Sequence, residues 1–296
     1  MKTRSADRKR PFFIVDVFAE AKYSGNQLAV IADAEGLPPS TMQKIARETN
    51  FSETTFIMSG RGRDGGYGVR IFTPGEEVPF AGHPVLGTAF IIRQEMAGKA
   101  QGVTLDLKAG RIPVSFTAGG VASMRQLSPE FGHVFRPGEI AKILGMAPGA
   151  IDERFPIEEV STGLPCIIVP LKRLEDVRRA RIDTAKYMKL AQASAAKAIL
   201  VFCPETYRKE NDLNVRFFAG YYGIPEDPAT GSANGCLAGY LARHRYFGKP
   251  DVQARVEQGY EIGRRSLILI SAQDRQGAID VNVAGRVLPV ARGELA

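Results

Sequence analysis

Glu53 is the first residue of this sequence that could move a proton. It lies in an apolar run, residues 51–58, that predicts a strand. If its face of the strand points inward, desolvation raises the pKa of its carboxyl and suits it to general acid and base catalysis. If Phe56 and Met58 face the core instead, Glu53 is solvated, and side-chain alternation by itself favours neither interpretation.

His83 and Asp227 could assist such a base. His83 precedes an apolar stretch, where it could donate to an anion or relay a proton, although a capping or core histidine is the more common role. Asp227 stands before Pro228, and an aspartate in that position usually only forms a turn. A second apolar stretch begins a few residues after Asp227, which makes it a candidate for the same chemistry.

The segments that position these residues are repeated along the chain. Residues 69–74 read Val-Arg-Ile-Phe-Thr-Pro, and the first apolar stretch follows a Gly/Pro-rich turn. Residues 215–219 read Val-Arg-Phe-Phe-Ala, and the second apolar stretch follows a similar turn. The repeat predicts two related halves with a site built between them.

Both apolar stretches predict buried helices, over residues 84–96 and 231–244, because apolar side chains cover nearly every side of them. Pro84 fits the first helical position, and Ser232 is an expected N-cap. A helix N-terminus offers unpaired N–H groups and a partial positive charge, so two that face one cleft would hold an anion. The N–H groups that would bind a substrate carboxylate belong to Gly82, His83, Gly231 and Ser232.

The order of the elements indicates the fold class. Strand-like and helix-like segments do not alternate strictly, which argues against a doubly wound parallel sheet. Each half has several strands and one central apolar helix, an α+β arrangement. The length of 296 residues suits two domains better than one. No G-x-G-x-x-G follows a strand and there is no P-loop, so nucleotide binding is unsupported.

The net charge of the protein by itself excludes few classes of function. Net charge is +7 and the pI is near 9.3, which raises the question of nucleic acid. The basic residues are scattered, however, apart from the run at residues 2–10, which we interpret as a solvated or disordered terminal tag. Aromatic residues do not interleave with a basic stripe, so binding of nucleic acid ranks last among the functions considered.

The cysteines and histidines indicate a reducing compartment and no metal site. Cys166, Cys203 and Cys236 are widely spaced and odd in number, which fits a cytoplasmic protein with no structural disulfide. The three histidines are too far apart in sequence to form a local metal site. Asp16 interrupts the apolar run at residues 12–15, so we expect neither a signal peptide nor a membrane span there.

Several motifs resemble those of the PhzF-like phenazine-biosynthesis family, and they occur in the same order over most of the chain. They are Asp16-Val17-Phe18 with Gly25-Asn26, Asn50-Phe51-Ser52-Glu53-Thr54-Thr55-Phe56, Phe72-Thr73-Pro74 with Glu77-Val78-Pro79-Phe80-Ala81-Gly82-His83-Pro84, and Asp227-Pro228-Ala229-Thr230-Gly231-Ser232-Ala233. One departure is Gln27, where the family usually has proline after Gly-Asn. We expect this departure to change a turn and not the chemistry.

The resemblance implies the diaminopimelate-epimerase-like fold, in which two pseudo-symmetric domains each wrap a β-barrel-like sheet around a central helix. The expected N-terminal domain is residues 11–128, completed by a C-terminal strand near 285–292. The expected C-terminal domain is residues 129–284. The site is expected in the cleft between the domains, which agrees with the internal repeat.

The resemblance also implies roles for individual residues. Glu53 is expected to be the general acid and base, His83 and Asp227 to orient and assist, and Ser232 to contact the substrate carboxylate. We expect Ser52 to contact the substrate as well. Related epimerases place a cysteine at the head of each central helix, whereas this chain has Gly82 and Gly231, so racemisation by two thiols is disfavoured.

These expectations describe an isomerase that uses no cofactor or metal and moves a proton on a small carboxylate substrate, as in the isomerisation of trans-2,3-dihydro-3-hydroxyanthranilate. One alternative is a one-base carboxylate epimerase or racemase. Another is a small-molecule binding protein whose site does not turn over. The expected partner is the substrate alone, with no nucleic acid and no membrane, and a homodimer is a possible assembly.

Overall fold

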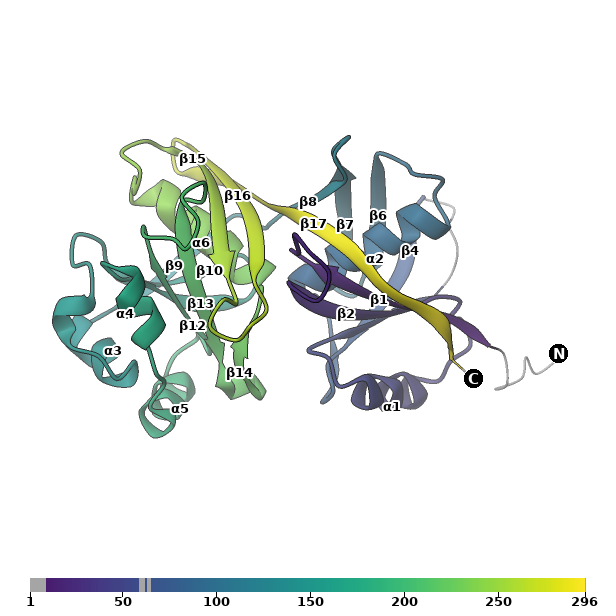
Figure 1. Cartoon of the computed structure of the whole chain (residues 1–296), viewed down its shortest axis with the longest axis horizontal. Coiled ribbons are helices and arrows are strands. Elements are labelled where there is room, and N and C mark those ends of the chain that lie inside the picture. The colour runs from purple at the N-terminus through teal and green to yellow at the C-terminus, as the bar shows by residue number, and fades with distance from the viewer. Residues whose placement is uncertain (1–8, 59–61, 63–64, 296) are drawn as a thin grey trace. The chain divides into compact units, whose positions relative to one another are not determined.

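A computed structural model describes residues 9–58, 62 and 65–295 of the chain. Most of the basic run at residues 2–10 lies outside the described residues. The chain folds as two compact units. Unit 1 contains the described residues up to Met124 together with those from Gly285 onward, and unit 2 is Arg125–Ala284. Figure 1 shows unit 1 in purple and blue with the yellow end of the chain, and unit 2 in teal to yellow-green.

The described residues of unit 1 form two helices and nine strands, the last of which is shared with unit 2. The helices are α1(Pro39–Thr49) and α2(Gly82–Glu95). The strands are β1(Arg10–Val17), β2(Asn26–Ile31), β3(Thr54–Ile57), β4(Tyr67–Phe72), β5(Glu77–Val78), β6(Gly102–Leu107), β7(Gly110–Phe116), β8(Val121–Arg125) and the C-terminal part of β17(Ala278–Leu295).

Eight of these strands close into a barrel. Their order is β17-β1-β2-β3-β4-β6-β7-β8, and β8 pairs with β17 to complete the ring. The pairs β2–β3 and β4–β6 are parallel. The pairs β17–β1, β1–β2, β3–β4, β6–β7 and β7–β8 are antiparallel. Closure leaves these strands with paired edges, so the barrel interior can be filled by a single apolar element.

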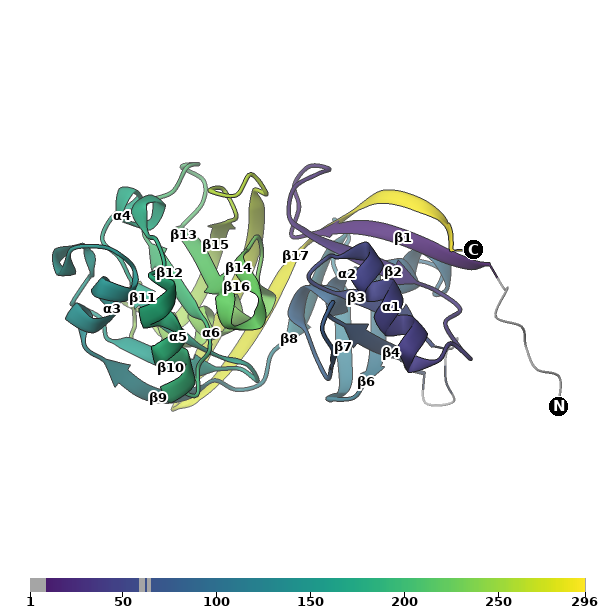
Figure 2. The same cartoon turned by 90° about the horizontal axis from the view of Figure 1, so that it is seen from below.

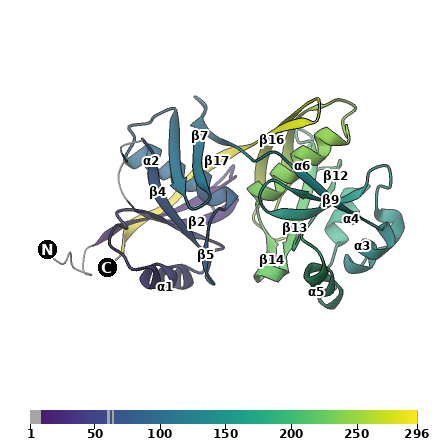
Figure 3. The same ribbon diagram turned by 180° about the vertical axis from the view of Figure 1, so that it is seen from behind.

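Helix α2 fills that interior. Ten of its fourteen residues are buried, and it contacts β1, β2, β3, β6 and β7. Gly87 lets the helix approach the sheet closely, because a Cβ there would lie 2.5 Å from a methyl of Leu28 and 2.9 Å from one of Val17. Figure 3 shows α2 running among the strands of unit 1. The prediction of a central buried helix in this half is therefore confirmed.

Helix α1 covers the outer face of the same sheet. Met42 and Ala46 of α1 pack against Phe56 and Phe72 of β3 and β4. The two phenylalanine rings meet edge to face, with centroids 5.4 Å apart. Figure 2 shows α1 over these strands. All four residues of β3 are buried because helices cover both faces of it.

Unit 2 contains four α-helices, two short 3-10 helices and the remaining strands. The helices are α3(Pro137–Ile143), α4(Leu174–Arg179), α5(Thr184–Ala193), α6(Gly231–Arg243), η1(Pro148–Ala150) and η2(Gly220–Tyr222). The strands are β9(Glu130–Phe135), β10(Ile157–Ser161), β11(Pro165–Pro170), β12(Ile199–Cys203), β13(Leu213–Ala219), β14(Ile224–Asp227), β15(Asp251–Gln258), β16(Ser266–Arg275) and the first part of β17.

The strand order of unit 2 repeats that of unit 1. It is β9-β10-β11-β12-β13-β15-β16-β17, with parallel pairs β11–β12 and β13–β15. The parallel pairs occupy the same places in the order as in unit 1. The short strand β14 pairs with β13 as β5 pairs with β4, and each is followed by the central helix of its unit. The prediction of two related halves is confirmed at the level of topology.

Helices cover both faces of the unit 2 sheet as well. Ile199, Val201 and Cys203 of β12 face α3, α4 and α5, in one apolar cluster. Phe202, on the opposite face, meets Tyr240 of α6 with ring centroids 5.9 Å apart. This alternation follows the two-residue period of a strand. Figure 3 shows α6 beside β16, which it also contacts.

The repeated Val-Arg-aromatic segments carry the same ion pair in both units. Arg70 of β4 makes two hydrogen bonds to Glu77 of β5, of 2.8 and 2.7 Å. Arg216 of β13 makes two to Glu226 of β14, of 2.9 and 2.7 Å. Each guanidinium also lies over the ring two residues further on, Phe72 or Phe218. The pair fixes the hairpin that leads into each central helix.

Candidate active site

Glu53 and His83 meet in unit 1. The Oε2 atom of Glu53 lies 3.4 Å from Nε2 of His83, and the two side chains are 14% and 6% exposed. Glu53 stands immediately before β3 and not within it, so the strand is shorter than the run 51–58 predicted. The structure thus brings together two of the three residues for which proton chemistry is expected.

The direction of Glu53 follows from the sheet. Thr55, two residues after Glu53 and therefore on the same face of the segment, accepts a hydrogen bond of 2.7 Å from Thr88 of α2. This face thus points toward the central helix. Phe56 faces α1 on the other side. Phe56 lies in a core and Glu53 is still largely shielded from solvent, because both faces of this segment are covered. The two interpretations of the strand pattern therefore do not exclude each other.

His83 is held as a neutral ring. Burial lowers the pKa of His83 from 6.5 to about 3, and a hydrogen bond to the backbone of Gln27 opposes this only in part. The Nε2 atom makes no hydrogen bond within the described residues, so the ring donates to the Gln27 carbonyl through Nδ1. Gln27 lies inside β2, paired with Asp16, and not in the turn we expected to change.

This tautomer determines what the pair can do. A neutral ring that donates through Nδ1 carries its lone pair on Nε2, the atom that faces Glu53. A protonated Glu53 can donate to that lone pair, whereas an ionised Glu53 cannot. The arrangement can therefore hold one proton on the carboxyl and orient it, which is what a general acid and base requires.

Helix α2 begins beside this pair. It starts at Gly82 with Ala81 as N-cap, so Pro84 is the third helical residue and not the first, as the sequence predicted. Within the described residues no side chain of the N-cap bonds to the helix. The first N–H groups of a helix have no partner inside it, so those of α2 remain available to an anion.

Helix α6 begins in the same way in unit 2. It starts at Gly231, and its N-cap is Thr230, so Ser232 is the second helical residue and not the N-cap we expected. Thr230 makes no capping bond from its side chain within the described residues. Asp227, which is 6% exposed, ends β14 three residues earlier and accepts a short hydrogen bond from the Thr230 hydroxyl.

Gln258 is a residue of this region that the sequence analysis missed. It is fully buried at the end of β15, and its side-chain amide bonds to Asp227, Thr230 and Asn234. A lone glutamine in a strand has no spacing or pattern that marks it. Only the position of β15 beside the start of α6 brings it to the site.

The predicted site residues divide between the units. Glu53, Ser52, Gly82 and His83 belong to unit 1, where Ser52 is half-buried next to Glu53. Asp227, Gly231 and Ser232 belong to unit 2. The prediction that the two helix N-termini face one cleft concerns how the units meet, and it stays a prediction.

All three thiols are buried, and none stands at the first residue of α2 or α6, although Cys236 is the sixth residue of α6. Cys166, Cys203 and Cys236 are free cysteines, and burial raises the pKa of Cys203 to about 12. The Cys203 thiol is therefore protonated at neutral pH and is a poor base, whereas a hydrogen bond from Cys166 lowers the pKa of the Cys236 thiol. Among the described residues, no three His, Cys, Asp or Glu side chains are grouped in a way that could hold a metal ion. No described helix is long and apolar enough to cross a membrane.

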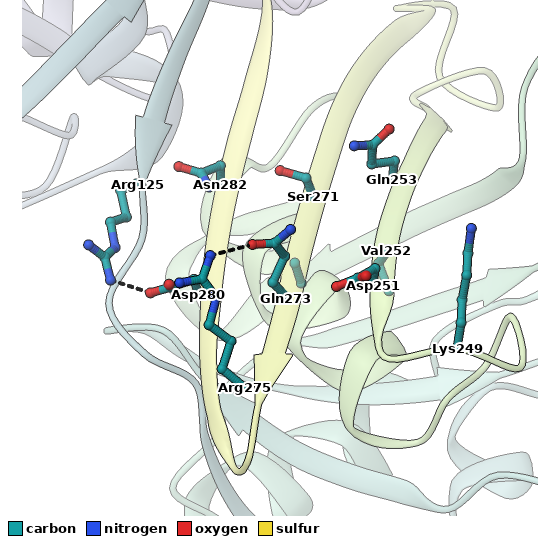
Figure 4. Close-up of a pocket in the computed structure, with 11 residues that line it drawn as sticks. Arg125, Lys249, Asp251, Val252, Gln253, Ser271, Gln273, Arg275, Asp280 and Asn282 are labelled. Carbon is teal, nitrogen blue, oxygen red and sulfur yellow. Dashed lines mark hydrogen bonds and ion pairs between the residues drawn. The ribbon is translucent and has the colours of Figure 1, made fainter.

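A separate polar hollow of about 620 Å³ lies on the sheet of unit 2. Figure 4 shows two rows of side chains across β15, β16 and β17. Gln253, Ser271 and Asn282 form one row, and Asp251, Gln273 and Asp280 form the other, as the strand register requires. Arg125 pairs with Asp280, and Arg275 donates to Gln273 at 2.9 Å. The hollow includes none of the predicted site residues.

Comparison with known proteins gives a consistent family match. Residues 15–293 match the family described as phenazine biosynthesis-like protein. The chain is 36% identical to the trans-2,3-dihydro-3-hydroxyanthranilate isomerase of Pseudomonas fluorescens, over 96% of this chain and 98% of that protein. A crystal structure of a PhzF-family phenazine biosynthesis protein from Bacillus anthracis matches with a TM-score of 0.88 and 28% identity, over 98% of this chain and 99% of that one.

A more distant structure shows how widely the fold is shared. The hydroxyproline epimerase of Agrobacterium vitis matches with a TM-score of 0.60, at 11% identity, over 98% of this chain and 93% of that one. At this identity the likeness shows the fold alone. The fold is thus α+β and epimerase-like, with a barrel-like sheet around a central apolar helix.

Proposed function

This chain is an isomerase of the PhzF-like phenazine-biosynthesis family, and we propose that it moves a proton on a small carboxylate substrate without a cofactor. Glu53 takes the proton from one carbon and returns it to another. His83 holds the carboxyl in place, and Asp227 assists from unit 2. Ser52 and the N–H groups of Gly82, Gly231 and Ser232 contact the substrate.

The contact between Glu53 and His83 carries this proposal. The two side chains are shielded from solvent, and the ring is kept neutral by burial. A carboxyl beside a neutral acceptor can carry a proton without forming a permanent ion pair. A salt bridge would instead hold Glu53 ionised and reduce its value as an acid.

The starts of α2 and α6 support a carboxylate substrate. Both helices are long, of 14 and 13 residues, and neither is capped by its N-cap side chain within the described residues. Each can offer an anion N–H groups and a partial positive charge of about half a unit. If both bind one carboxylate, charge that develops on the substrate is stabilised as the proton leaves.

The substrate class follows from the relatives. The Pseudomonas fluorescens protein is named for trans-2,3-dihydro-3-hydroxyanthranilate, a cyclic carboxylate. We propose a substrate of this kind for the present chain. The buried, free thiols also support the proposal that it works in a reducing compartment such as the cytoplasm.

The test follows hydrogen exchange during turnover. Trans-2,3-dihydro-3-hydroxyanthranilate is incubated with the protein in deuterated water, and the product is examined by proton NMR. We expect an isomer in which the position of the double bonds has changed. Asp227→Asn and Glu53→Gln are measured in parallel, with Glu48→Gln, an exposed glutamate of α1, as the control.

Three outcomes separate the candidate functions. Rearranged product that depends on Glu53 supports the isomerase. Deuterium at a single stereocentre with no change of double bonds indicates the one-base epimerase instead. Binding of the compound with neither rearrangement nor exchange indicates a binding protein, or a different substrate, and would overturn the proposal for this compound.

A further inference from the structure

The amide of Gln258 has a complete set of hydrogen bonds at the start of α6. Its Nε2 group donates to the backbone oxygen of Asp227 at 2.9 Å and to Oγ1 of Thr230 at 3.1 Å. Its Oε1 atom accepts from the backbone N–H of Thr230 at 3.2 Å and from Nδ2 of Asn234 at 2.8 Å. Two donors and two acceptor sites are all that such an amide has, so every one is used.

These contacts fix the orientation of the amide. If the amide were turned over, its NH₂ group would face two other donors, those of Thr230 and Asn234. Its oxygen would face the carbonyl of Asp227. Both changes leave buried polar groups unpaired, which is costly in a side chain with no exposed surface.

The orientation of Gln258 in turn fixes the hydroxyl of Thr230. Because Oγ1 of Thr230 accepts a hydrogen bond from the Gln258 amide, its own single proton is directed to the carboxylate of Asp227, to which the hydroxyl donates a short hydrogen bond. The same hydroxyl is then not used to cap α6, although threonine is a favoured N-cap. The first N–H groups of α6 stay available.

The segment between Asp227 and Thr230 has little freedom to move away. Ser266 of β16 donates to the Pro228 oxygen at 2.9 Å. Gly259, next to Gln258, lies so close that a Cβ there would be 2.6 Å from the same oxygen. The neighbouring strands thus hold the turn, while Gln258 sets its hydrogen bonds.

We propose that Gln258 is a positioning residue of this isomerase, acting through Thr230 to hold the carboxylate of Asp227 in one orientation at the start of α6. The inference rests on the proposed function, in which Asp227 assists the proton transfer. Gln258 itself does not touch the substrate.

The test removes, one at a time, the hydrogen bonds that connect Gln258, Thr230 and Asp227. Gln258→Met keeps the size of the side chain without its amide, and Thr230→Val keeps the shape of threonine without its hydroxyl. We expect each to lower kcat about 10–100-fold with a smaller change in KM, because a small displacement of an assisting group slows the chemical step. Thr230→Ser restores the hydroxyl and should keep kcat within about threefold of wild type.

A matched control is Glu257, the residue that precedes Gln258 in β15. Glu257 is also fully buried and accepts four hydrogen bonds, but from residues 207–214, away from Asp227. Glu257→Gln should lower the melting temperature while leaving kcat unchanged in the folded protein. A loss of kcat in Gln258→Met at similar stability then reflects positioning and not a weakened fold.

The double variant Gln258→Met with Thr230→Val decides whether the two residues act on Asp227 through the same series of hydrogen bonds. We expect the double variant to be no slower than the slower single variant, since either change alone already breaks the hydrogen-bond connection to Asp227. Effects that multiply, or wild-type kcat in Thr230→Val, would overturn the inference. If Gln258→Met does not fold, Thr230→Val and Thr230→Ser decide it alone.

Asp227→Asn separates this inference from the proposed function. If Asp227→Asn is slow and the Gln258 and Thr230 variants are normal, the positioning role fails and the proposed function stands. If Asp227→Asn turns over at the wild-type rate, the role of Asp227 fails, and the positioning role fails with it.

Discussion

Nε2 of His83 lies 3.4 Å from Oε2 of Glu53, and the ring is neutral because burial holds its pKa at about 3. The contact therefore joins a carboxyl to a lone pair and not to a cation. The backbone carbonyl of Gln27 sets the tautomer, so a strand that carries none of the proposed catalytic side chains still controls the pair.

Glu53→Gln should reduce turnover about 10²–10⁴-fold, the usual contribution of general acid and base catalysis. The amide keeps the shape of the side chain but cannot take and return a proton. Stability should hardly change, or should rise, because burying an ionised carboxylate costs free energy that an amide avoids. Substrate affinity should largely survive. Melting temperature, ligand affinity and exchange of substrate hydrogen in deuterated water are measured on one preparation.

Other results for Glu53→Gln would have different meanings. A structural Glu53 would lose stability and activity together, and a solvated one would lose neither. If Glu53→Gln exchanges substrate hydrogen with deuterated water at the wild-type rate, Glu53 is not the group that moves the proton. Glu48→Gln, on the exposed side of α1, controls for the loss of one negative charge from unit 1.

His83 should make the protein less stable in acid. Its folded pKa of about 3 lies below its ordinary value of 6.5, so the unfolded chain binds the proton more readily. The stabilising contribution of the neutral ring is complete above pH 6.5 and is lost as the pH falls toward 3. His83→Gln, which does not titrate, should therefore lose less stability than wild type between pH 7 and pH 4.

Urea unfolding at several pH values measures this difference, and His133→Gln, at an exposed histidine, is the control. The ring resonances of His83 should show no titration between about pH 5 and pH 8. A midpoint inside that window would mean that the ring is charged during function and pairs with Glu53 as a cation.

Glu77 should contribute stability that acid removes. The hydrogen bond from Arg70, followed by that from Lys108, lowers the pKa of Glu77 from 4.5 to about 2 against the effect of burial. A carboxylate with a lowered pKa stabilises the fold above pH 4.5 and loses this effect as the pH falls toward 2. Glu77→Gln should cost about 1–3 kcal/mol at neutral pH, because it leaves Arg70 without its ionic partner.

The difference between wild type and Glu77→Gln should shrink as the pH falls below 4.5. The neighbouring Glu76 is exposed, and Glu76→Gln should show a much smaller effect at every pH. A constant difference across the acid range would show that packing, and not the charge of Glu77, supplies the stability.

Gly25 should be far less tolerant of alanine than Gly36. Both have a positive φ, of 69° and 83°, so alanine is strained at either, at about 1 kcal/mol. At Gly36 a Cβ would meet nothing within 4 Å, but at Gly25 it would lie 2.3 Å from the Val17 oxygen. Gly25→Ala should thus cost roughly 3 kcal/mol or more. Equal melting temperatures for the two variants would contradict this account of the turn.

The sequence by itself determined the elements that repeat. The two Val-Arg-aromatic runs and the two apolar stretches were sufficient to predict related halves with a central helix each, because the pattern of apolar side chains decides what can be buried. Its motifs also indicated the family. The second helix begins at Gly231 as predicted, but α2 begins two residues before Pro84 and the N-cap of α6 lies two residues before Ser232, because helix ends depend on backbone geometry that residue types only suggest.

Only the tertiary structure decided which polar groups bond to one another. The Gln27 carbonyl reaches His83, and the Gln258 amide reaches Thr230, across strands that are distant in sequence. Neither contact follows from composition or periodicity, because a hydrogen bond depends on direction and on separations of about 3 Å. Burial is an average property that a sequence pattern can carry, whereas the tautomer of one ring and the direction of one hydroxyl depend on particular neighbours that only the folded chain supplies.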